Sequence, residues 1–135
     1  MKFGITCDAN AESGVSEVML GLNDAFEEYF GDRFYDDSSI GLFIVLMCRD
    51  PAWNFKQRIR FVKNRNTLYI DIMLDLNVMS RADPGTRKQI VGEKIVNEVP
   101  QIIAKKKFKD FDLPRFSRDL RMWFEDQGWI EKLEN

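Results

Sequence analysis

The clearest pattern in the sequence is the alternation of aliphatic and other side chains from Thr67 to Leu76. Every second position is aliphatic: Leu68, Ile70, Ile72, Leu74 and Leu76. Successive side chains of a β-strand point to opposite faces of the sheet, so this alternation predicts a strand with one aliphatic face. That face must be covered by other elements. The opposite face carries two carboxylates, a phenol and a thioether, which suit contact with water or with a partner.

Three further segments have the patterns of strands. They are 2–7, 40–48 and 56–63. Residues 40–48 form an almost continuous apolar run, which is typical of a central strand covered on both faces. The turn Asn64–Asn66 joins the third segment to the strand that begins at Thr67, because asparagine tolerates a positive φ angle. We therefore expect a hairpin over 56–76, with Arg58 and Arg60 beside Asp71 and Asp75.

Apolar residues at helical spacing predict three helices. The first is capped by Ser13 and ends at Gly31, and the second begins at Asp83 and is kinked or split by Pro100. The third is capped by Asp112 and ends at Gly128. The expected order of elements is β-α-β-β-β-α-α.

This order predicts an α+β fold for residues 1–135, which we expect to form a single domain. Short turns between strands favour an antiparallel sheet of about four strands. The amphipathic helices would pack mainly on one face of that sheet, over the aliphatic side of 67–76.

The composition excludes most catalytic chemistry. The chain has no histidine, two cysteines and eight scattered glycines, so it lacks His-dependent nucleophile systems, a structural zinc site and a phosphate-binding loop. Asp71 and Asp75 lie on one strand face, about 13 Å apart from the strand rise, which is too far for a shared metal ion. Pairing with Arg58 and Arg60 explains them more simply. We therefore expect no enzyme activity, catalytic residue, cofactor or metal site.

The sequence also indicates a compartment. No basic-then-apolar leader is found at the N-terminus, and no apolar run reaches the ~18 residues that span a bilayer. Cys7 and Cys48 lie within apolar strand patterns, which favours reduced thiols over a disulfide. We expect a cytoplasmic protein that does not bind membranes.

Charge is distributed unevenly along the chain. Residues 1–37 carry two basic and nine acidic side chains, a net charge of −7, whereas the remaining residues carry 18 basic and 13 acidic side chains, a net charge of +5. An acidic surface with aromatic anchors suits capture of a basic protein. The candidate partner-binding residues are Asp24, Glu27, Glu28, Asp32, Phe34, Tyr35, Asp36 and Asp37, with Trp53 as a second anchor. The alternative is that these side chains form a solvated helix face, with the aromatic residues in the core.

A second hypothesis is a small regulatory protein that binds nucleic acid through the basic hairpin over 56–65. Its cations are Lys56, Arg58, Arg60, Lys63 and Arg65, and a second basic run lies at 105–109. The acidic first third and the sequence pI of about 5.3 argue against phosphate binding.

Several short motifs resemble those of small immunity proteins from bacterial polymorphic-toxin and contact-dependent growth inhibition systems. The motifs are Leu68–Asp71, Ala82-Asp83, the helix over 90–103, Phe108–Asp112 and Asp119-Leu120, and the resemblance covers about residues 40–124. It implies a cytoplasmic, non-enzymatic protein that binds one cognate toxin domain, often a nuclease, and blocks its active site or substrate entry. In this resemblance Asp71, Phe111 and Asp112 are scaffold positions, and partner choice would lie in the acidic first third.

Overall fold

The computed structural model describes residues 2–9, 13–31, 41–53, 59–106 and 111–132. The strands are β1 (Lys2–Ala9), β2 (Gly41–Arg49), β3 (Ile59–Val62) and β4 (Thr67–Asp75), and the helices are α1 (Val15–Val18), α2 (Leu22–Phe30), α3 (Leu76–Arg81), α4 (Pro84–Lys106) and α5 (Leu113–Asp126). Two 3-10 turns, η2 (Pro51–Trp53) and η3 (Lys63–Arg65), flank β3 along the chain. The predicted α+β class with four strands is confirmed.

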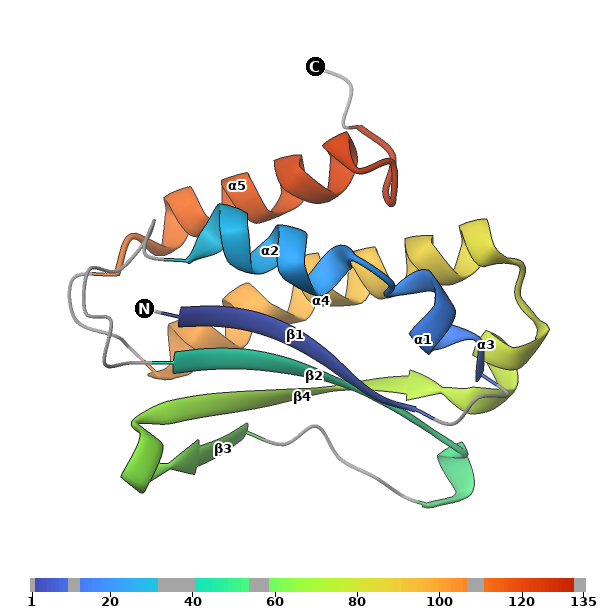
Figure 1. The fold of residues 1–135 in the computed structure, drawn as a ribbon, viewed down its shortest axis with the longest axis horizontal. Coiled ribbons are helices and arrows are strands. Elements are labelled where there is room, and N and C mark those ends of the chain that lie inside the picture. The colour runs from blue at the N-terminus through green and yellow to red at the C-terminus, as the bar shows by residue number, and fades with distance from the viewer. Residues whose placement is uncertain (1, 10–12, 32–40, 54–58, 107–110, 133–135) are drawn as a thin grey trace.

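The sheet is mixed, with the strand order β1-β2-β4-β3. β2 pairs in parallel with both β1 and β4, and only β3 and β4 are antiparallel. The antiparallel pairing expected for the whole sheet is therefore wrong for two of the three strand pairs. The reason is connectivity: helices separate β1 from β2, and β3 goes to the edge of the sheet, so β4 returns beside β2 in the same direction. All five helices lie on one side of this sheet (Figure 1).

The helices follow the predicted pattern with two differences. The first predicted helix is two helices, α1 and α2, because Gly21 between them has a φ of +80°. The short helix α3 was not expected, and it begins directly after β4 because the Asp75 carboxylate accepts the backbone N–H groups of Asn77 and Val78. α4 continues through Pro100 as one helix, so it is not split there.

The predicted caps of the later helices are confirmed. Asp83 Oδ1 accepts the backbone N–H of Thr86 at 2.7 Å in the first turn of α4, and this bond lowers the pKa of the Asp83 carboxyl. Asp112 Oδ1 accepts the N–H of Arg115 at 3.2 Å, with Pro114 in the first turn of α5. Among the described residues, none of the helices combines the length and hydropathy that crossing a bilayer requires.

An aromatic core joins β1, α2 and α5. The Phe3 ring of β1 stacks on Phe116 of α5 with ring centroids 5.5 Å apart, and it meets Phe30 of α2 at 6.3 Å. Phe26 of α2 lies 4.5 Å from Phe30 and 5.7 Å from Trp123 of α5. The four phenylalanines are almost completely buried. Their packing fixes α2 and α5 side by side above the sheet.

The outer edge of β1 is partly covered by α2. The side-chain Oδ1 of Asn23 accepts the backbone N–H of Ile5 at 3.0 Å. This bond satisfies a backbone donor that points away from β2, at an edge where no further strand pairs within the described part of the chain.

Candidate interaction surface

The outward face of α2 is acidic. Leu22, Phe26 and Phe30 recur at intervals of four residues and are buried, which directs the residues between them away from the core. Asp24, Glu27 and Glu28 are consequently exposed. The segment over 13–31 contains no lysine or arginine, so no cation on α1 or α2 is available to neutralise this face.

These carboxylates have no ion pair or side-chain hydrogen bond with any other residue that the structure describes. Glu17 on α1 is likewise exposed and without such a partner in this part of the chain. In contrast, α5 carries three acids, and each one lies within 4 Å of a cation. The negative charge of α2 is thus directed into solvent and is not balanced within the helix layer.

A hollow of about 340 Å³ lies beside this acidic face, between α2 and α5. Its described lining residues are Ala25, Glu28 and Tyr29 from α2 and Trp123 from α5. The Tyr29 and Trp123 ring centroids are 6.5 Å apart. Tyr29 is half-buried, Trp123 is 7% exposed and Glu28 is exposed, so the hollow combines two aromatic residues with one solvent-accessible acid.

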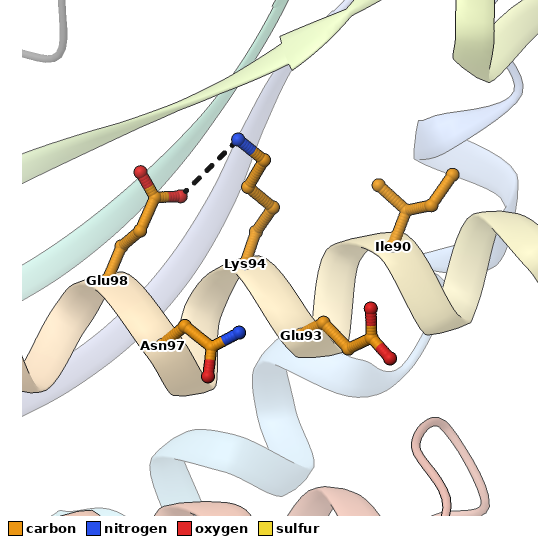
Figure 2. A pocket seen from close by; sticks show the side chains of 5 residues that line it. All are labelled: Ile90, Glu93, Lys94, Asn97 and Glu98. Carbon is orange, nitrogen blue, oxygen red and sulfur yellow. Dashed lines mark ion pairs between the residues drawn. The ribbon is translucent and has the colours of Figure 1, made fainter.

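A second hollow, of about 300 Å³, runs along α4 (Figure 2). Ile90, Lys94 and Glu98 point to one side of α4, and the Lys94 Nζ lies 3.7 Å from a Glu98 oxygen. Glu93, also in this lining, accepts a hydrogen bond from Gln89. Each charged group of this hollow therefore has a partner on α4, unlike Glu28.

An adjoining hollow of about 430 Å³ shares Ile90 and Lys94 and extends to β4 and α3. Its other described lining residues are Pro51, Met73, Leu74, Asp75, Val78 and Met79. Asp75 is the cap of α3, so its carboxylate is already engaged there.

The remaining candidate groups for chemistry have structural roles. The Asp71 side chain is 1% exposed, and its Oδ1 accepts a hydrogen bond from Arg60 Nη2 at 2.7 Å. The predicted cross-strand pairing is confirmed for these two residues. Arg60 also lies over the Tyr69 ring, 5.2 Å from its centroid. Cys48 is buried, and burial raises the pKa of its thiol, which keeps the sulfur protonated and unreactive. Within the described residues, no three metal-ligating side chains of the His, Cys, Asp and Glu types come together.

Comparison with known proteins decides the family. The family described as Immunity protein 44 matches residues 1–126. The chain belongs to this family. No curated protein and no solved structure matches it. Immunity 44 membership implies a toxin partner and an antitoxin role, and such families are generally non-enzymatic.

The extent of the match corrects one expectation. The sequence motifs suggested a resemblance over about 40–124, with the acidic first third outside it, whereas the Immunity 44 match begins at residue 1. The acidic helix α2 therefore belongs to the family region. The residues assigned to the scaffold by the resemblance have matching roles: Asp71 binds Arg60, Asp112 caps α5, and Phe111 packs 5.4 Å from Phe116.

The structure unites only part of the partner surface that the sequence suggested for this Immunity 44 protein. Asp24, Glu27 and Glu28 share α2. Asp32, Phe34, Tyr35, Asp36 and Asp37 lie outside the described residues. Trp53 ends η2, which follows the C-terminal end of β2, so its backbone is not part of the acidic helix α2.

Two residues of the hollow were not among the predicted site residues. Tyr29 and Trp123 fit the apolar stripes of their helices at helical spacing, and such a stripe does not show which ring edges remain accessible. Only the side-by-side packing of α2 and α5 reveals the hollow. In the basic hairpin over 56–65, Arg60 binds Asp71 and is therefore less available to bind a phosphate group. Lys56 and Arg58 lie outside the described residues.

Proposed function

We propose that this single-domain protein is a cytoplasmic immunity protein that neutralises one cognate, secreted or contact-delivered bacterial toxin domain by stoichiometric binding. It acts without catalysis, by blocking the active site or the substrate entry of the toxin. The observation that carries the proposal is an exposed acidic helix whose carboxylates have no cation among the described residues, in a member of an immunity family.

The charge of this surface supports a nuclease as the toxin. A nuclease attracts the phosphate backbone of its substrate with clustered lysine and arginine side chains. The carboxylates of Asp24, Glu27 and Glu28 offer the opposite charge to such a groove, as phosphates do. Because long-range attraction accelerates encounter, this complementarity suits an inhibitor that must find its target before nucleic acid is cut.

The test uses the cognate toxin domain, which we expect to be encoded immediately upstream of this chain's gene. Wild-type protein should form a one-to-one complex with it, rescue cells that express it, and associate more slowly as salt rises. Replacing Asp24, Glu28, Asp36 and Asp37 with lysine should slow association strongly at low salt. An unchanged association rate, measured by stopped-flow fluorescence, would refute this surface assignment.

A competition measurement separates occlusion from distortion. If the acidic face occupies the substrate groove, a catalytically inactive toxin variant bound to an oligonucleotide should release it when the immunity protein is added. Stable ternary complexes on size-exclusion chromatography would show that the substrate groove stays open and that this mechanism is wrong.

A further inference from the structure

The geometry points to a role for the hollow between α2 and α5: it receives one arginine side chain of the toxin. This inference rests on the proposed function and specifies its central contact. Its elements are Ala25, Glu28 and Tyr29 of α2 and Trp123 of α5, which line the same space.

The hollow is lined by one acidic residue, Glu28, and by no basic residue among its described lining residues. Two residues after Trp123, Glu125 binds Arg121 at 3.0 Å, which is how α5 satisfies its own carboxylates. Glu28 lies across the same region on α2 and has no cation among the residues that the structure describes. A guanidinium supplied by the toxin would form with Glu28 the same kind of ion pair that Arg121 and Glu125 form within α5.

The lining favours arginine over other basic groups. The apolar walls accommodate a hydrocarbon stem, while the charged end reaches the rim. A guanidinium is planar, binds a carboxylate through two parallel N–H donors and packs against aromatic rings, whereas an ammonium group is compact and strongly hydrated. The volume of about 340 Å³ is near the lower limit of small-ligand sites, roughly 300–1,000 Å³, and suits one side chain.

An arginine held in this way would be a hot spot of the complex. Such residues are enriched in arginine and aromatics, and they fill pockets from which surrounding contacts exclude water. The bond between Glu28 and the guanidinium would then control how long the complex lasts, whereas the other acids of α2 would control how fast it forms.

The first experiment uses N-acetylarginine amide as a probe and does not need the toxin. In ¹⁵N-labelled protein, it should shift the Trp123 indole N–H and the Ala25 and Glu28 amide signals, with a dissociation constant on the order of 10 mM. N-acetylnorleucine amide, which has a similar stem without charge, should leave them in place, and N-acetyllysine amide should act more weakly. Absence of these shifts, or identical shifts in Glu28→Gln, would overturn the inference.

The second experiment uses the upstream-encoded toxin domain and two variants of the hollow. Ala25→Met fills the space without changing charge, and Glu28→Gln removes the carboxylate. Both should raise the dissociation rate about 10- to 100-fold. Glu17→Gln is the matched control, since it removes the same charge from an exposed glutamate of α1 that does not line the hollow. It should change the dissociation rate by less than about threefold.

The outcomes separate the two levels of the argument. Equal effects of Glu17→Gln and Glu28→Gln, with wild-type kinetics for Ala25→Met, would leave the acidic surface valid and reject the arginine site. A wild-type protein that does not bind the toxin would reject the proposed function, whereas the amide titration would still decide whether the hollow recognises arginine. Thermal unfolding of each variant checks that a loss of binding is not a loss of fold.

Discussion

Helices α2 and α5 share one aromatic core but arrange their charges in opposite ways. α2 contributes Phe26 and Phe30 to that core, and α5 contributes Phe116 and Trp123. On their outer faces, the acids of α5 lie beside cations at 3.0–3.9 Å, whereas those of α2 have no cation among the described residues.

The contrast shows how spacing determines the role of a charge. In α5, Arg115 and Arg121 stand four residues before Asp119 and Glu125, a separation that brings side chains together on a helix. Its charges therefore keep the surface polar without projecting a strong field. α2 has no basic residue at any spacing, so its charge remains available to another molecule.

The largest expected effects concern the aromatic core that α2 and α5 share. Phe26→Ala in α2 and Phe116→Ala in α5 each remove a completely buried ring from the same core. Both should lower the free energy of unfolding by about 3–5 kcal/mol. Urea denaturation followed by circular dichroism measures it. A loss below about 1 kcal/mol for either variant would show that its helix is not part of the common core.

Charge reversal tests the difference between the outer faces of α2 and α5. Replacing Asp24, Glu27 and Glu28 with lysine changes the net charge by six, from −2 to +4, and should slow association with the toxin about 10- to 100-fold at low salt. Replacing Asp119, Glu125 and Asp126 of α5 makes the same change in net charge. We expect it to slow association only about threefold, since these groups lie outside the proposed interface.

Stopped-flow measurements on both triple variants provide the comparison, after circular dichroism has shown that each is folded. Equal slowing by the two variants would mean that net charge alone governs encounter. The distinction between the two helix faces would then have no functional meaning.

The smallest effects concern stability. Glu125→Gln removes the partner of Arg121 and should lower the free energy of unfolding by about 0.3–0.5 kcal/mol, the usual value of such a helical pair. Glu27→Gln removes a carboxylate that has no ion pair in the described structure and should be neutral within error. The difference should fade at high salt. A larger loss for Glu27→Gln would indicate that this acid stabilises the fold.

Most elements could be predicted from the sequence, because periodicity is a local property. The alternation over 67–76 and the helical stripe of α5 each identify an element without reference to the rest of the chain. Parallel pairing of β2 with β4 could not be predicted in this way, since it depends on where β3 lies. Helix α3 was missed because its cap, Asp75, also fits the strand pattern.

For the candidate site too, local features could be predicted from the sequence and features that depend on the fold could not. The exposure of Glu17, Asp24 and Glu28 followed from the helical period and the apolar stripe, and the structure confirms it. The hollow could not be predicted, because Tyr29 and Trp123 come from opposite ends of the chain and are neighbours only after folding. Its position depends on the ring contacts that set α2 against α5.

Asn23 gives α2 a second consequence for assembly. Sheet edges with unsatisfied backbone groups invite pairing with further copies of the same chain, and such growth has no natural end point. By binding the Ile5 N–H, the Asn23 amide blocks that route at one position, one residue before the first exposed acid of the helix. α2 therefore protects part of the β1 edge from pairing with other copies of the chain, while its acidic face stays accessible to a binding partner.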